Sequence, residues 1–206
     1  MPWRVRAGTS RAILWGMGGH VIKCGLAPVL LDLMHRGYAS GFVLNGSAAI
    51  HDFEIALAGH TSEDVETVLP DGRFGAAEET GSEMNRAIVE GDRAGLGIGK
   101  RSGVRWRIAA RANARPEASL LLNAYHARVP VTVHVAIGTD TPHTHPAADG
   151  CGHRQRHPSG LPPVLRLWSP ELHQGGIYLN VGSAVLLPEV FLKAVSAVRN
   201  LRSPPG

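Results

Sequence analysis

The chain has few aromatic residues, few cysteines and no long apolar run, and each shortage excludes a class of protein. Aromatic residues make up 5% of its 206 residues, and the two cysteines, Cys24 and Cys151, lie far apart. A disulfide framework is therefore not expected, and a reducing compartment fits. No run reaches the roughly 18 to 20 apolar residues that cross a bilayer, and residues 1–11 lack the apolar core of a signal peptide. We expect a cytoplasmic protein with no membrane partner.

Charge of one sign is also sparse. The formal net charge is only +4, and the basic residues are scattered. One loose cluster combines four cations with Trp106 as its single aromatic neighbour: Lys100, Arg101, Arg105 and Arg107. Nucleic-acid sites need a denser basic patch, often with aromatic platforms. We interpret the cluster as a solvated helix face and expect no nucleic-acid partner.

What the chain does contain is an alternation of apolar strands and helical patterns. Hydrophobic residues make up 44% of the sequence, beside 25 glycines and 14 prolines. Strands are expected at residues 12–15, 41–44, 131–137 and 177–181, and helices at 21–34, 78–90, 104–114, 119–128 and from 188 or 189 to about 200. Alternating strands and helices favour an α/β fold with a parallel sheet. The length suits a single domain over residues 1–206.

Small or polar residues follow each of the four strands. They are residues 16–19 (Gly-Met-Gly-Gly), 45–47 (Asn-Gly-Ser), 138–140 (Gly-Thr-Asp) and 180–183 (Asn-Val-Gly-Ser). Parallel sheets bind ligands at the carboxyl ends of their strands, so convergence of these groups predicts a binding cleft. Gly16, Gly18 and Gly19 suit the approach of a pyrophosphate to a helix N-terminus. The alternative is a tight turn that needs glycine for packing only, because the spacing departs from GxGxxG at Val21.

Several polar residues allow two interpretations. His51, Asp52 and Glu54 either face the cleft or form a capped, solvated helix N-terminus, and for Glu54 we favour the second. The loop over residues 140–149 contains Asp140, His143, His145 and Asp149, whose spacing could hold zinc or another divalent metal. Together with His134, the first three define an alternative function, a metal-dependent hydrolase. Polar lining of the loop is the simpler interpretation, and no metal ligand is assigned.

Long motifs in this chain resemble the deoxyhypusine synthase family, specifically its bacterial deoxyhypusine synthase-like branch. The resemblance covers most of residues 12–201 and rests on GMGGHVIKCGL, LNGSAAIHDFEIALAGHTSEDV, FGAAEETG, VPVTVHVAIGTDTPHTHPAADG and GGIYLNVGSAVLLPEVFLKAVSAVRNL. It implies a Rossmann-like fold with a mostly parallel sheet and helices on both faces, in a homotetramer that binds NAD. It also implies a transferase that moves the aminobutyl group of spermidine to a lysine, the reaction that begins hypusine formation.

The resemblance assigns site residues by motif. It places the cofactor against two turns and one acid: Gly19, His20, Val21, Ile22, Lys23, Asn45, Gly46, Ser47 and Asp52. Asp140 matches the aspartate of the family's polyamine site, and His51 replaces a glutamate. The position of the family's catalytic histidine falls on Asn180. The imine-forming lysine of the family has no match, since Lys193 does not fit it.

These departures predict a weakened enzyme. The chain looks truncated at both ends, and we expect little or no synthase activity from it. A non-catalytic nucleotide-binding protein is a further alternative. Residues 152–170 are rich in Pro, Arg and His where the family has an apolar helix. A reading-frame change in the gene would explain this segment, and the alternative is a genuine proline-rich surface loop.

Overall fold

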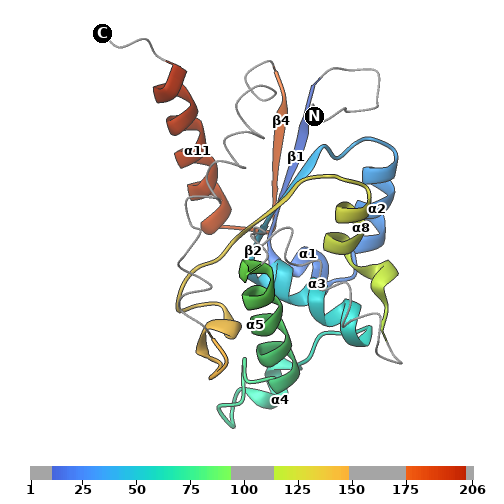
Figure 1. Cartoon of the computed structure of the whole chain (residues 1–206), viewed down its shortest axis with the longest axis vertical. Coiled ribbons are helices and arrows are strands. Elements are labelled where there is room, and N and C mark those ends of the chain that lie inside the picture. The colour runs from blue at the N-terminus through green and yellow to red at the C-terminus, as the bar shows by residue number, and fades with distance from the viewer. Residues whose placement is uncertain (1–10, 94–113, 149–174, 203–206) are drawn as a thin grey trace.

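A computed structural model describes residues 11–93, 114–148 and 175–202 of the chain (Figure 1). Several predictions lie outside these residues. They are the helix over 104–114, the basic cluster at residues 100–107, Asp149, Cys151 and the possible frame change at residues 152–170.

The centre of the molecule is a four-stranded parallel sheet. Its strands are β1 (Ile13–Met17), β2 (Gly41–Asn45), β3 (Val131–His134) and β4 (Ile177–Val181). Their order is β3-β2-β1-β4, and every neighbouring pair is parallel. In register, Leu14 of β1 lies opposite Gly41 of β2 and Tyr178 of β4. The predicted α/β fold with a parallel sheet is confirmed.

Helices cover both faces of this sheet. They are α1 (Gly19–Lys23), α2 (Ala27–His35), α3 (Gly46–Ala58), α4 (Val65–Val68), α5 (Glu78–Arg93), α8 (Leu120–His126) and α11 (Leu186–Arg202), with short 3-10 turns η1 (Pro116–Ala118) and η2 (Thr141–Thr144). Figure 1 shows α11 on one side of the strands and α2 and α8 on the other. Within the described parts, no helix is both long and apolar enough to cross a membrane.

Alternation along the strands divides the core between the two faces. Met17, Phe42 and Leu44 are fully buried against α2 and α8. Leu14 and Val43 point the other way and pack on Leu187 and Ala194 of α11, in a smaller cluster. Successive side chains of a strand face opposite sides, so apolar strands of this kind need cover on both. The continuous apolar runs in the sequence are explained by this double burial.

The single helix predicted over residues 21–34 is wrong, because two helices occupy this stretch. Gly25 adopts a left-handed conformation with φ of +80° between α1 and α2. Its N–H donates to the carbonyl of Ile22, and the N–H of Leu26 donates to that of Val21. A glycine in this conformation commonly ends a helix. Cys24 therefore sits exposed at the end of α1 rather than inside a helix.

The third strand is also shorter than predicted. β3 ends at His134, three residues before the end of the apolar run. Ile137 is 75% exposed, and Gly138 is left-handed with φ of +88°. The chain turns here because the carbonyl of Ala136 accepts hydrogen bonds from the Thr139 N–H and hydroxyl. This early turn brings Asp140 back toward the sheet.

Candidate functional site

The loops after all four strands meet at the carboxyl edge of the sheet. Sequence order reverses between β1 and β4, where the N–H of Gly18 donates to the carbonyl of Val181 at 2.9 Å. A methyl group on Gly18 would overlap the carbonyl of Gly182, and one on Gly46 would overlap the carboxylate of Asp140. The predicted convergence of the strand ends is confirmed. Such a reversal of strand order at the carboxyl edge is where open α/β sheets bind ligands.

The glycines of the first turn are needed for space rather than for unusual backbone angles. Gly18 has an extended conformation with φ of −85°, which any residue can adopt. A methyl group on Gly16 would overlap the ring of Tyr178, and one on Gly19 would overlap Ser47. The space that a Cβ atom would need at Gly16 and Gly19 is filled by other residues of the chain, not left open for a ligand. This favours the interpretation that these glycines are needed for packing.

The first turn of α1 nevertheless has polar groups to offer a ligand. No side chain caps this helix, and His20 is exposed while Lys23 is half-buried. Val21 and Ile22 belong to the apolar core, and the N–H of Val21 donates to the carbonyl of Gly18, so the N–H groups of Gly19 and His20 are the ones at the start of the helix. An uncapped helix start presents N–H groups that suit an anion.

The second turn is organised around the start of α3. The side-chain carbonyl of Asn45 accepts a hydrogen bond from the N–H of Ala48 at 2.9 Å, which caps the helix. Gly46 and Ser47 begin the helix, and Ser47 is half-buried against Gly19. An asparagine cap is typical of a helix that starts directly after a strand.

Asp52 is buried and turned toward α8. Its carboxylate accepts hydrogen bonds from the Ser119 hydroxyl at 2.7 Å and from the N–H groups of Leu120 and Leu121 at 2.6 and 3.2 Å. Burial raises the pKa of Asp52 to about 6, although these three hydrogen bonds oppose the rise. The alternative of a solvated helix N-terminus is wrong for Asp52, which is 1% exposed. All three donors belong to the start of α8.

Glu54 and His51 form a pair that the sequence analysis did not identify. The Glu54 carboxylate lies 3.1 Å from Nδ1 of His51 and accepts hydrogen bonds from the hydroxyls of Ser62 at 2.6 Å and Thr80 at 3.0 Å. Burial opposes the charge of Glu54, but the hydrogen bonds outweigh it and lower the pKa of this carboxyl. The solvated interpretation of Glu54 is wrong, since the residue is 5% exposed. The available signal was a three-residue spacing of polar residues in an apolar helix.

Asp140 lies against the start of α3, opposite Gly46. Its carboxylate accepts a hydrogen bond from the N–H of Ala136 at 2.9 Å. Burial raises the pKa of Asp140, against the opposing effects of that N–H and of the nearby His143. The loop is tied to α5, because the Asn85 amide donates to the carbonyl of Pro142 at 2.8 Å. The structure thus fixes Asp140 at the carboxyl edge.

Asn180 lies near the end of β4, at the exposed edge of the sheet. Its side-chain amide donates a hydrogen bond to the carbonyl of Ser183 at 2.8 Å. Ser183 is buried, and its hydroxyl accepts a hydrogen bond from the N–H of Leu187 at the start of α11. Asn180 therefore helps to shape the turn between β4 and α11.

The alternative metal centre is not assembled. Among residues 11–93, 114–148 and 175–202, no three His, Cys, Asp or Glu side chains are grouped so that they could hold a metal ion. Nε2 of His134 faces the hydroxyl of Thr132, while Nε2 of His145 faces Glu78 on α5 at 3.1 Å. The prediction of a site formed by His134, Asp140, His143 and His145 is wrong, because His143 lies near Asp140 but no third of these side chains joins them.

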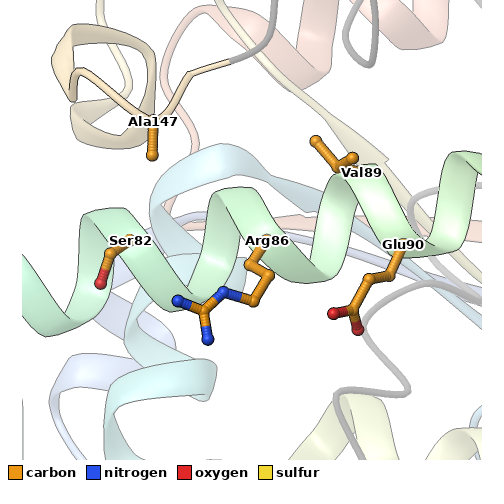
Figure 2. Close-up of a pocket in the computed structure, with 5 residues that line it drawn as sticks. All are labelled: Ser82, Arg86, Val89, Glu90 and Ala147. Carbon is orange, nitrogen blue, oxygen red and sulfur yellow. The ribbon is translucent and has the colours of Figure 1, made fainter.

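A hollow of about 320 Å³ lies on α5, beside the loop that contains His145. Ser82, Arg86, Val89 and Glu90 of α5 line it together with Ala147 (Figure 2). Figure 2 shows Arg86 between Ser82 and Glu90 along the helix. None of the residues assigned to the cofactor or to catalysis lines this hollow.

Comparisons with known proteins support the fold. No protein-family model and no curated protein matches the chain. An arginine dihydrolase of the ornithine–ammonia cycle in cyanobacteria has a similar structure, with a TM-score of 0.50 and 18% identity over 90% of this chain. A protein of the proposed LOR/SDH type from Methanococcus maripaludis S2 has a TM-score of 0.49 and 16% identity over 84% of the chain. The chain spans 24% and 44% of these two proteins. At such identities the first likeness supports the α/β fold and nothing about function.

Proposed function

We propose that this chain binds NAD at the carboxyl edge of its sheet, as a protein related to the deoxyhypusine synthases. The main support is the meeting of four parallel strand ends where strand order reverses. Dinucleotides bind parallel α/β sheets at such points. Three of the long motifs that resemble the synthase family, residues 16–26, 44–65 and 129–150, include the residues that directly follow β1, β2 and β3.

The residues at this edge suit the cofactor. The uncapped start of α1, with Gly19 and His20, offers N–H groups to a pyrophosphate, and Lys23 at the end of this short helix adds a cation. Asn45, Gly46 and Ser47 offer small polar groups at the neighbouring strand end. The backbone of Val21 and Ile22 completes the predicted set, whereas the Asp52 carboxylate is committed to α8. When bound, NAD supplies a hydride acceptor.

An amine is the substrate class that this proposal implies. Asp140 is a carboxylate held at the same edge, where it suits an ammonium group of a polyamine such as spermidine. Asn180 stands at the position of the family's catalytic histidine, and an amide cannot accept a proton as imidazole does. We therefore expect cofactor and amine binding with little transfer. A homotetramer in the cytoplasm completes the proposal.

A calorimetric titration with NAD tests the proposal. Lys23→Glu replaces a cation of the proposed cofactor set by an anion and is expected to weaken NAD binding at least about tenfold, equal to about 1.4 kcal/mol. Lys193→Glu is the matched control, because it makes the same charge change on an exposed part of α11. Absence of NAD binding by the unaltered chain, or equal weakening in both variants, would contradict the proposal.

A nucleotide-binding protein without catalysis is the second candidate. Asn180 favours it, because its amide is used in the β4–α11 turn. NAD binding in the absence of any spermidine-dependent NAD reduction would support this candidate over an active synthase.

A further inference from the structure

The pair formed by His51 and Glu54 is built like an oriented acid–base group. The two residues are three apart on α3, so they lie on the same side of the helix. The Glu54 carboxylate, held also by Ser62 and Thr80, lies 3.1 Å from Nδ1 of His51. An ionised carboxylate can only accept hydrogen bonds, so Nδ1 is the ring nitrogen that donates. In the neutral ring, Nε2 then holds the lone pair.

The opposite edge of the His51 ring faces the proposed site. Cδ2, the atom next to Nε2, lies 3.3 Å from the point where a side chain on Gly19 would begin. Ser47 contacts the same point from one helical turn earlier. The His51 side chain is 19% exposed, and no hydrogen bond to its Nε2 occurs among the residues that the structure describes. The edge of the ring formed by Cδ2 and Nε2 therefore lies on the side of the turn after β1.

We propose that His51 is a general base at this edge, with Glu54 as its positioning residue. Nε2 accepts a proton from an ammonium group of a bound amine, which breaks one N–H bond, forms another, and leaves a neutral amine beside an imidazolium. Glu54 balances the charge that appears on the ring. The negative carboxylate behind a neutral imidazole favours a cationic proton donor over a neutral one. The amine class rests on the proposed function, whereas the oriented base does not.

The transfer is uphill for a free amine. An alkylammonium is a weaker acid than imidazolium by about 4 pKa units, so a later step that consumes the neutral amine must draw it forward. Asn180 cannot perform this proton transfer. His51 thus supplies a proton acceptor at the turn after β1, whereas the Asn180 amide at the end of β4 is not one.

Chemical modification of histidine tests the assignment. Diethyl pyrocarbonate reacts with an accessible, unprotonated ring nitrogen, and peptide mass spectrometry locates each modified histidine. In the folded chain at neutral pH we expect His51 to react, and about threefold slower reaction in Glu54→Gln, because the carboxylate no longer fixes the proton on Nδ1 and the lone pair on Nε2. Glu78→Gln is the matched control, since Glu78 makes the same 3.1 Å pair with His145 but is exposed. His126, exposed at the end of α8 and outside the proposed site, is the internal control for reagent strength.

Four results decide the proposal. Modification of His51 only after unfolding in denaturant, or an equal rate in Glu54→Gln, would overturn it. Spermidine is expected to slow reaction at His51 and not at His126, and an unchanged His51 rate would exclude the amine as donor. Nitrogen-15 spectra of the unaltered chain read the tautomer directly if Glu54→Gln does not fold. A proton on Nε2 rather than Nδ1 would contradict the orientation. If the chain passes these tests but does not bind NAD, the proposed function is wrong and the assignment of His51 as an oriented base still holds.

Discussion

Asp52 joins two helices through a single buried carboxylate. Its oxygens accept hydrogen bonds from the Ser119 hydroxyl and from the first N–H groups of α8, so α3 supplies the cap of a helix 67 or more residues later in the chain. Buried donors left without an acceptor cost about 1 to 3 kcal/mol each. The residue that the motif match assigns to the cofactor therefore also stabilises the fold.

The pH dependence of folding stability should show the buried charge of Asp52. The folded-state pKa of about 6 lies above the ordinary value of 3.8, so ionisation weakens the folded state. The contribution of Asp52 to the free energy of unfolding is largest below pH 4. It falls by roughly 3 kcal/mol as the pH rises through 6, for a pKa shift of this size. Urea unfolding from pH 4 to 7.5 should show this fall in the unaltered chain and lose it in Asp52→Asn. Parallel curves for the two proteins would contradict the assignment.

The effect of Glu54 on the pH dependence of stability should have the opposite sign. Its pKa is lowered in the folded chain, so its contribution to stability is present above the ordinary value of 4.5 and is lost as the pH falls through the lower folded-state pKa. Glu54→Gln is expected to cost on the order of 1 to 3 kcal/mol at neutral pH, since three hydrogen bonds to a charge become bonds to an amide. Thermal unfolding checks this. Glu78→Gln, at a 77% exposed side chain, should change stability much less.

At the scale of elements, the turns after β1 and β4 touch through backbone atoms. Gly18→Ala would place a methyl group on the carbonyl of Gly182, and backbone cannot move aside as a flexible side chain can. We expect a loss of about 1 to 3 kcal/mol of unfolding free energy in denaturant titrations. An unchanged midpoint would show that the two turns separate at little cost.

The sequence predicted the elements better than their ends. Apolar runs marked all four strands, and proline and small residues marked the start of α11 within three residues. The break at Gly25 was missed because the residues around it are apolar on the expected side, and only the left-handed backbone reveals the stop. The last residues of the third strand were missed because Val135, Ala136 and Ile137 have strand-like side chains but form the turn before Asp140.

The candidate site, too, could be predicted from the sequence only in part. Convergence of the strand ends could be predicted, because parallel strands end at one edge. The partners of Glu54 could not, since Ser62 and Thr80 lie 8 and 26 residues further on and reach it only through the packing of α5 and the preceding loop on α3. Scattered histidines suggested a metal centre, but His134 faces Thr132 of its own strand and His145 faces Glu78 on α5. Pairing of side chains across elements depends on packing that periodicity does not encode.

For the whole molecule, the central claim is that the carboxyl edge of the sheet binds NAD. The edge combines an uncapped helix start, two glycine turns and a held carboxylate, whereas the hollow on α5 contains none of the residues assigned to the cofactor. The carboxyl edge and the hollow on α5 are formed by different residues. A method that reports on each residue can therefore tell them apart.

The most direct measurement is a titration of the nitrogen-15-labelled chain with NAD, followed by amide chemical shifts. The proposal predicts the largest changes at Gly19, His20 and Ser47, with Ser183 beside them, and small changes at Ser82 and Arg86. No shifts at any NAD concentration, or shifts confined to α5, would contradict it.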